Sequence, residues 1–317
     1  MPSSPQNDVW PDLPYGRWKE TCATLHLWTQ VVGKIRLAQT PWLNHSWHVP
    51  LYVTARGLIT APISGAGRVF DIAFDFVDHE LVLRASDGAS RRVKLQPRTV
   101  ADFYATVMAA LGELGFAFEI DRVPNEIANA IPFDRDTTHA AYDAEYAQRF
   151  WRVLVQVDRV LFQFRTSFLG KCSPVHFFWG SFDLAVTRFS GRRAPLHPGG
   201  VPSLSDAVVR DAYSHEVSSA GFWPGGTGVE YAAFYSYAYP EPNGFRRSPV
   251  RPAAAFFNEA LGEFLLPYDA VRTAADPDGA LLEFLHSTYE AAAETGAWDR
   301  AALECSPGKA RVPRAVS

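Results

Sequence analysis

One stretch of the sequence, residues 68–77, alternates strictly between large apolar side chains and small or acidic ones. The apolar positions are Phe70, Ile72, Phe74 and Phe76, and between them lie Asp71, Ala73 and Asp75. A period of two predicts a β-strand that buries one face and turns the other to water, as in antiparallel sheets. Turn-forming residues at 78–79 and 86–88 extend the pattern into a meander. The sequence therefore predicts an α+β fold, a mainly antiparallel β-sheet covered by helices, rather than a doubly wound parallel sheet.

Apolar side chains at three- and four-residue spacing predict helices elsewhere in the chain. The first is an amphipathic helix over residues 16–37, whose buried stripe would be Trp18, Cys22, Leu25, Thr29 and Val32. A second spans residues 100–114, and Thr99 followed by Asp102 is typical of its N-terminus. A third, residues 139–168, carries apolar side chains on more than one side, so we expect it to be a central packing element.

A connection rich in proline and polar residues, 122–138, divides a chain that exceeds the usual size of one domain. We therefore expect an N-terminal α+β half, residues 1–138, and a C-terminal α+β half, residues 139–317, which carries the candidate site. Each half contains a helix, a loop bearing histidine and a strand interrupted by glycine. This similarity suggests two interlocked halves related by a degenerate duplication.

The charge and cysteine content of the chain limit its partners and its location. A formal net charge of −4 and a pI near 6.1 do not supply the basic surface that nucleic acids or anionic membranes require, so we expect neither partner. The three cysteines lie far apart without a CxxC pair, which favours reduced thiols. No apolar run approaches the roughly 20 residues that cross a bilayer. We expect a cytoplasmic protein that binds a small molecule, with a homo-oligomer left open.

Residues 173–188, SPVHFFWGSFDLAVTR, place polar side chains inside an otherwise apolar and aromatic run. We expect this run to be one central strand, in which buried polar side chains need partners or a function. In a straight strand His176 and Asp183 would point to opposite faces. Only a bulge at Gly180 would bring them together.

The strongest chemical candidates are His176, His215 and Glu216, supported by Asp183 and Glu263. Two imidazoles and a carboxylate are what acid–base catalysis or a divalent metal ion requires, so the first three are also the candidate metal ligands. The structural alternative is a core histidine at position 176 and an ion pair between Glu216 and Arg188. In a strand His215 and Glu216 would face opposite sides, and both alternatives stay open.

A second group of candidates is aromatic and would line a pocket with polar edges. It comprises Trp179, Trp223, Tyr235 and Tyr237 in strand-like segments, together with His26 and His45 from the first half. We treat these residues as candidate substrate-binding groups. The alternative is a crowded aromatic core, with a surface loop around His45.

Three segments, HLWTQVVGK, SPVHFFWGSFDLAVTRFSGR and YSHEVSSAGFWPGG, resemble a family of bacterial proteins known only as a domain of unknown function, numbered 5996. The resemblance extends from Trp10 to about Ala302. It implies no activity, cofactor or catalytic residue, so the candidate site rests on the chemistry of the residues alone.

The common catalytic and nucleotide-binding motifs are missing from the sequence: it has no P-loop, dinucleotide fingerprint, nucleophile elbow, HExxH or CxxC pattern. Two functional hypotheses follow. The first is a small-molecule enzyme that uses His and Glu as acid–base groups or metal ligands in an aromatic-lined cleft. The second is a non-catalytic protein that binds a small molecule in the same cleft, and a self-associating structural protein is a third alternative.

Overall fold

The computed structural model describes residues 9–226 and 228–314 of the chain. Within these ranges twelve strands form one sheet in the order β11-β12-β10-β9-β8-β7-β1-β2-β4-β5-β6, with β3 paired to β4. Its strand pairs are antiparallel, which confirms the α+β fold with a mainly antiparallel sheet. The strands are β1 (Leu51–Val53), β2 (Gly57–Thr60), β3 (Ile63–Gly65), β4 (Arg68–Asp75), β5 (Glu80–Ala85), β6 (Ser90–Lys94), β7 (His176–Phe178), β8 (Asp183–Arg193), β9 (His215–Trp223), β10 (Ala233–Tyr239), β11 (Phe256–Asn258) and β12 (Glu263–Pro267).

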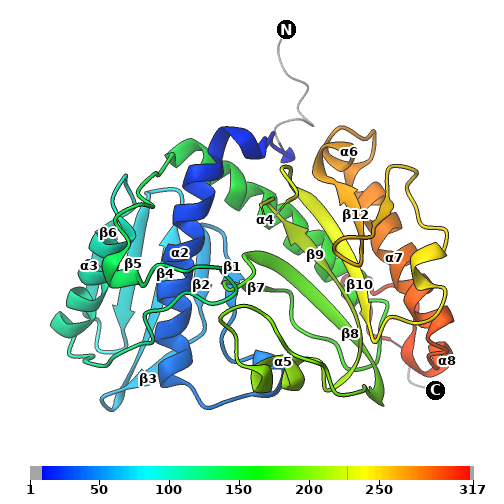
Figure 1. The fold of residues 1–317 in the computed structure, drawn as a ribbon, viewed down its shortest axis with the longest axis horizontal. Coiled ribbons are helices and arrows are strands. Elements are labelled where there is room, and N and C mark those ends of the chain that lie inside the picture. The colour runs from blue at the N-terminus through cyan, green and yellow to red at the C-terminus, as the bar shows by residue number, and fades with distance from the viewer. Residues whose placement is uncertain (1–8, 227, 315–317) are drawn as a thin grey trace, which may run out of the picture.

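Helices cover both halves of this sheet. They are α2 (Tyr15–Gln39), α3 (Val100–Glu113), α4 (Ala144–Arg165), α5 (Asp206–Ala212), α6 (Tyr268–Arg272), α7 (Pro277–Thr295) and α8 (Arg300–Leu303), with short 3-10 turns η1 (Asn44–Ser46), η2 (Phe133–Arg135) and η3 (Phe245–Arg247). Figure 1 shows α2 crossing in front of the sheet between the N-terminal half, blue to cyan, and the C-terminal half, green to red. None of the helices in the described ranges has both the length and the apolarity needed to cross a membrane.

The alternating stretch forms β4 as predicted. Its four apolar side chains, Phe70, Ile72, Phe74 and Phe76, are at most 1% exposed. The intervening acids find basic partners, since Arg84 donates to Asp71 at 2.9 Å and Arg56 to Asp75 at 2.5 Å. The predicted register of the meander is therefore confirmed.

The two halves meet inside the sheet. Leu51 of β1 pairs with Phe177 of β7, so backbone hydrogen bonding continues from one half to the other. The ring of Trp18 on α2 also packs against that of Phe150 on α4, with 5.2 Å between the ring centroids and an interplanar angle of 37°. The sheet is thus continuous from one predicted half to the other. The division of the chain at residues 138 and 139 stays a prediction, and so does the duplication.

The first helix has the predicted position, but it is not amphipathic. Nearly every side chain of α2 from Thr24 to Arg36 is buried, because α2 packs between α3, α4 and the β2–β3 segment. Its polar side chains are paired instead of solvated: Lys34 lies 2.8 Å from Asp121, and Arg36 donates to the carbonyl groups of residues 61 and 62. A polar residue on this helix therefore does not mark a face exposed to water.

The expectation of one straight central strand was wrong. Residues 173–188 form the β7–β8 hairpin, whose turn is closed by a 2.8 Å hydrogen bond from the Phe182 N–H to the Phe178 carbonyl, with Phe182 at a φ of 59°. Paired residues of a hairpin point to one face. Because His176 pairs with Ala185 and Phe178 with Asp183, the turn places His176 and Asp183 on the same face of the sheet.

The C-terminal half of the sheet has one face packed on helices and one face that borders cavities. Helices α4 and α7 pack against β8, β9 and β10. Toward these helices point apolar residues such as Leu184, Phe222 and Phe234, which belong to the main core. The residues alternating with them carry polar groups on the opposite face, among them Asp183, Thr187, Ser219, Tyr235 and Tyr237. The strand period therefore gathers the polar side chains of this half on the face away from α4 and α7.

The long helix predicted at residues 139–168 is α4, which begins after an N-cap at Asp143. The Asp143 carboxylate accepts hydrogen bonds from the backbone N–H groups of Glu145 and Tyr146 at 3.0 and 3.1 Å. Leu154 in its middle is completely buried. The helix is the central packing element that the sequence predicts.

Candidate functional site

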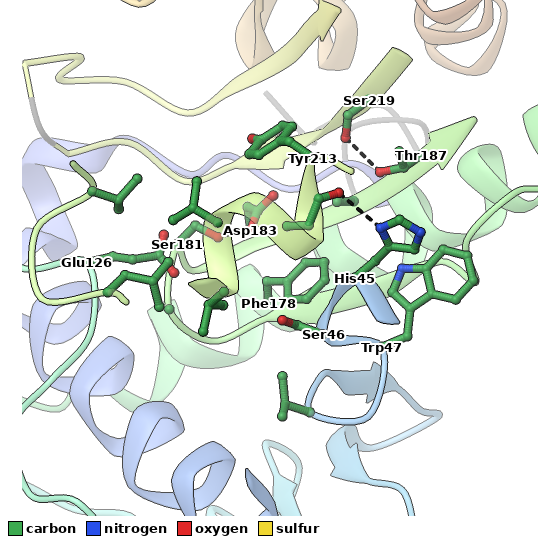
Figure 2. Close-up of a pocket in the computed structure, with 18 of the residues that line it drawn as sticks. His45, Ser46, Trp47, Glu126, Phe178, Ser181, Asp183, Thr187, Tyr213 and Ser219 are labelled. Atoms are coloured by element: carbon green, nitrogen blue, oxygen red, sulfur yellow. Dashed lines mark hydrogen bonds between the residues drawn. The ribbon is translucent and has the colours of Figure 1, made fainter. Parts of the chain in front are cut away.

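Two adjoining cavities lie on the polar face of the C-terminal half. The larger, about 890 Å³, is bounded by α2, residues 124–131, the β7–β8 turn, β10 and β12. The smaller, about 270 Å³, extends toward η1 and α5. Both are lined by Glu126, Gly180, Ser181, Asp183, Tyr213, Tyr235 and Tyr237. In Figure 2, which shows lining residues of the smaller cavity, Glu126, Ser181 and Asp183 lie together and His45 and Trp47 lie at the other end.

Asp183 and Tyr235 form the polar centre shared by the two cavities. The Tyr235 hydroxyl donates a short hydrogen bond to Asp183 Oδ2, and the Ser181 hydroxyl donates to Oδ1 at 2.5 Å. Burial raises the pKa of Asp183, although both donors act in the opposite direction. Burial and the Asp183 charge raise the pKa of Tyr235 well above its ordinary value. The tyrosine therefore stays protonated and acts as a hydrogen-bond donor.

Glu126 is held in the cavity by its backbone neighbours. The backbone of Glu126 has a φ of 60°, in the left-handed region, and its N–H donates to the Pro202 carbonyl at 3.1 Å. The side chain of Gln30 fixes the preceding residue, accepting from the Asn125 N–H at 2.7 Å and donating to the Asn125 carbonyl at 2.9 Å. The Glu126 carboxyl group lies against Gly180, where a Cβ atom would overlap Oε1. Glycine at position 180 thus leaves space for this carboxyl group.

Glu126 and Glu263 are carboxyl groups without a protein partner. Burial and the charge of Asp183 raise the pKa of each to about 7. Neither carboxyl group makes a hydrogen bond or ion pair with any residue in the described ranges. Glu126 is exposed as a whole residue and Glu263 is half-buried, whereas the protein atoms that surround their carboxyl groups remove part of the water shell and so raise the pKa. Both carboxyl groups are therefore crowded by protein but not sealed from solvent.

The remaining polar wall is closed by internal hydrogen bonds. The hydroxyl oxygens of Tyr213 and Tyr237 are 3.0 Å apart, and those of Thr187 and Ser219 are 2.9 Å apart. Burial raises the pKa of Tyr213 to about 12. His26 Nε2 lies 2.7 Å from the Gly180 carbonyl oxygen, and burial lowers the pKa of this histidine to about 4. The imidazole is neutral near pH 7 and positions the turn that carries Asp183.

The residues named from the sequence divide into those that line the cavities and those that do not. Asp183, His26, Trp223, Tyr235 and Tyr237 line the larger cavity, and Trp179 and His45 line the smaller one. Trp179 is also a core residue: it is 4% exposed, and its Nε1 donates to the Val49 carbonyl at 3.0 Å. His176, His215 and Glu216 line neither cavity.

Glu216 is part of a surface ion pair. Because Val217 and Ser219 line the smaller cavity, strand alternation turns Glu216 to the opposite face. Its carboxylate accepts from Arg192 Nη2 at 2.7 Å and from the Ser190 hydroxyl at 2.8 Å. Arg188, the partner expected from the sequence, is elsewhere: its guanidinium stacks 3.5 Å from the Phe164 ring and donates to Ser167. Arg192 lies in the segment between Phe189 and Arg193 in which the register of β8 against β9 shifts.

The two candidate histidines are also apart from the cavities. His176 is completely buried between the rings of Trp47 and Phe178, and neither of its ring nitrogens has a hydrogen-bond partner in the described part of the chain. Burial, reinforced by the nearby Arg165, lowers its pKa to about 3. His215 Nδ1 lies 3.1 Å from the Ser214 hydroxyl. His176 is therefore a core residue in this structure.

The described part of the chain offers no set of metal ligands. Among residues 9–226 and 228–314, no group of three or more His, Cys, Asp or Glu side chains is placed to hold a metal ion. His176 and Glu216 point to opposite faces of the sheet, so the three expected ligands do not converge.

Sequence reasoning missed Glu126 and Tyr213. Glu126 lies in the segment interpreted as a connection between halves, where an acidic residue is typical of a solvated loop. Tyr213 follows a short helix, and nothing in its local sequence indicates its bond to Tyr237. For Glu126 the available signal was Pro124 two residues earlier, since proline marks loops and loops often carry function. Tyr213 has no glycine or proline within seven residues.

The fold and the cavities define an α+β protein with one twelve-stranded sheet and an acidic, tyrosine-lined cavity on one of its faces. The model of a family of unknown function, DUF5996, matches residues 10–305, and the chain belongs to that family. No curated protein and no solved structure matches the chain.

Proposed function

We propose that this protein is an enzyme that binds a small organic molecule in the larger cavity and transfers protons to or from it. The observation that carries the proposal is the pair Glu126 and Glu263: two carboxyl groups without protein partners that face one cavity and have pKa values raised to about 7. A carboxyl group with such a pKa is partly protonated at neutral pH. It can therefore donate or accept a proton at that pH with only a small free-energy cost. The setting proposed for this chemistry is the cytoplasm.

The cavity has the size and surface of a small-molecule site. Its volume of about 890 Å³ lies within the range of ligand pockets, roughly 300–1,000 Å³. Trp223, Tyr235 and Tyr237 supply aromatic surface, and the carboxyl groups supply polar contacts. This role differs from the metal-ligand chemistry considered from the sequence, because the proposed acid–base groups are two carboxyl groups that belong to no metal-ligand cluster among the described residues.

Asp183 has a different role in this proposal. Its two oxygens are occupied by Ser181 and Tyr235, so it is less free than the glutamates to exchange a proton with a ligand. Its negative charge is the second cause of the raised pKa of Glu126 and of Glu263. Asp183 therefore acts as a positioning residue that tunes the two glutamates.

A second candidate function is binding without catalysis. It is favoured by the internal bonds of Asp183 with Tyr235 and of Tyr213 with Tyr237, because four polar groups of the cavity are already paired within the protein. In that case the glutamates would only bind the ligand. The two functions differ in whether the bound molecule is changed.

The test is incubation of the purified protein with a metabolite extract, followed by mass spectrometry of both the solution and the washed protein. For the enzyme we expect one compound to be consumed and another formed by the wild type, and neither change with the Glu126→Gln/Glu263→Gln double variant. The matched control is Glu113→Gln, a solvent-exposed glutamate on α3 paired with Arg91. Retention of a compound without conversion would establish the binding protein instead. No conversion and no retention would reject both functions.

A further inference from the structure

The larger cavity has an electrostatic bias that points to the charge of its ligand. The residues that line the two cavities include Glu126, Asp183 and Glu263 but no lysine or arginine among residues 9–226 and 228–314. A cavity lined by charges of one sign raises the local concentration of ligands of the other sign and repels those of its own. The surface of this cavity therefore favours cations.

Other ionisable groups around the cavity do not cancel this bias. His26 is neutral at pH 7, because burial lowers its pKa to about 4. Burial raises the pKa of the Cys22 thiol, which stays neutral as well. His139 borders the cavity, but its Nδ1 lies 2.8 Å from Asp136 Oδ2, so any charge on the ring is balanced within that pair.

Aromatic rings supply the second half of a cation site. Tyr15 of α2 and Trp223 of β9 line the same cavity, and Gly225 and Gly226 pass between these rings with φ values of 107° and 122°. A Cβ atom on Gly225 would lie 3.0 Å from the Tyr15 ring, and one on Gly226 would lie 3.5 Å from Trp223. Glycine at these positions lets the chain approach both rings. Aromatic faces attract ammonium groups that have lost part of their water shell.

The smaller cavity adds an apolar requirement. Apart from the polar centre that it shares with the larger cavity, its wall is largely aliphatic and aromatic, with Leu37, Val49, Leu204, Val208 and Val209 among its members. It opens beside Asp183 and Tyr235, which line both spaces. A ligand that reaches from one cavity to the other therefore carries its charge at one end and an apolar group at the other.

We infer that the ligand is an organic ammonium ion whose charged nitrogen faces Glu126, Asp183 and Glu263 and whose apolar substituent occupies the smaller cavity. The inference deepens the proposed function and rests on it for the choice of cavity. An ammonium group supplies N–H donors to the two glutamates that have no protein partner, and it offsets the repulsion between these carboxylates and Asp183. A neutral ligand would leave this repulsion unchanged, and an anionic one would increase it.

Binding of such a cation also depends on pH. Ionised glutamates attract the ammonium group, and protonated ones do not, so affinity should rise between pH 6 and pH 8 while the amine stays charged. The tyrosines around the cavity stay neutral over this interval, because burial raises the pKa values of Tyr15, Tyr213, Tyr235 and Tyr237. Repeating the measurement with His139→Gln separates the effect of the two glutamates from that of His139, which pairs with Asp136 at the cavity edge.

The experiment compares ligands that share one apolar group and differ in charge. One set is 2-phenylethylamine, 2-phenylethanol and 3-phenylpropionate, and the other is hexylamine, hexanol and heptanoate. Binding to the full chain is measured by calorimetry and thermal shift at pH 6 and pH 8. We expect at least one amine to bind about tenfold or more tightly than its alcohol and its carboxylate, a difference that corresponds to one favourable charge contact.

The variants locate the binding site. Glu263→Gln and Glu126→Gln should each weaken amine binding and reduce its rise with pH, and the double variant should remove that rise, while Glu113→Gln should leave both unchanged. Preference for an alcohol or a carboxylate would overturn the cation inference but leave a small-molecule function standing. Amine binding that is insensitive to both cavity variants would overturn the site. If no member of either set binds, the ammonium inference fails, while turnover in the metabolite extract decides the proposed function separately.

Discussion

The Tyr235 hydroxyl reaches across strand β9 to donate a hydrogen bond to Asp183 on β8. The residue between them in the sheet is Gly221, which pairs with Tyr235 on one side and with Ala185 on the other. A side chain at position 221 would occupy the path of the tyrosine. The hydrogen bond at the polar centre of the cavity thus depends on Gly221, because this residue has no side chain.

Gly221→Ala should therefore destabilise the protein and displace Tyr235. The added Cβ atom would overlap the Leu184 carbonyl oxygen and lie 2.6 Å from the Tyr235 hydroxyl. We expect a loss of about 1–3 kcal/mol in the free energy of urea unfolding, as for other overpacked sites. The control is Gly112→Ala on α3, where a Cβ atom meets nothing within 4 Å and alanine favours the helix. Equal stability of the two variants would show that Gly221 is not required for close approach.

Removing the hydroxyl group tests the bond itself. Tyr235→Phe leaves the buried carboxyl of Asp183 with one side-chain donor, Ser181, so unfolding should become easier by about 1–3 kcal/mol. Loss of the donor should also raise the pKa of Asp183 further. Tyr231→Phe is the control, because Tyr231 is exposed and outside the cavity walls. A change below about 0.5 kcal/mol for Tyr235→Phe would argue that the bond adds nothing to stability.

Parts of the fold follow from local sequence, and the site largely does not. The alternation of Phe70 through Phe76 decides the register of β4, because one face of that strand must be buried. Local pattern does not reveal what covers a helix, which is why α2 was predicted to be amphipathic although Lys34 and Arg36, outside its predicted stripe, are buried as well. Their partners come from residues about 12–90 positions away in the chain.

The candidate site was only half predictable for a similar reason. Tyr235 and Tyr237 could be named because they are aromatic side chains with a polar end in a strand-like segment, a type that lines pockets. The hairpin at Gly180 was missed because bulky aromatic residues surround it and its left-handed residue is Phe182, a side chain that rarely adopts this conformation. Glu126 could not be named, since its place in the cavity depends on Gln30 and Pro202, both distant in the sequence.

Leu154→Ala tests whether α4 is central to the core. Leu154 is completely buried, so its truncation should lower the free energy of unfolding by about 2–5 kcal/mol. On the same helix Phe162 is 60% exposed, and Phe162→Ala should cost less than about 1 kcal/mol. Urea unfolding of the two variants compares them directly. A loss under about 1 kcal/mol for Leu154→Ala would remove α4 from the core.

Glu216→Gln tests whether Glu216 belongs to the ion pair with Arg192 or to the ligand-binding site. Glu216 is bound to Arg192, whose side chain is 48% exposed, so the pair is screened by water and its loss should cost no more than about 1 kcal/mol. Ligand binding should be unchanged, because Glu216 lines neither cavity. Calorimetry with the ligands named above, together with urea unfolding, measures both effects. Loss of binding in this variant would return Glu216 to the candidate site.

The dependence of stability on pH separates Glu263 from ordinary surface carboxylates. Burial and Asp183 raise the pKa of Glu263 to about 7 in the folded protein, above the ordinary value of 4.5. Between these two values the folded state holds the proton more tightly than the unfolded state, so stability falls as pH rises from about 4.5 to about 7.

Glu263→Gln removes the ionisation and should stabilise the protein at pH 8 by about 1–2 kcal/mol, a figure reduced for the water that reaches the half-buried carboxyl group. At pH 4 the gain should vanish, because the carboxyl group is then protonated in both states. Urea unfolding at the two pH values checks this, with Glu113→Gln, exposed and paired with Arg91, as a variant that should show no gain at pH 8. A destabilised Glu263→Gln protein at pH 8 would mean that the charge of Glu263 is held by the fold, and the cavity would then lose the unpaired carboxylate on which its chemistry depends.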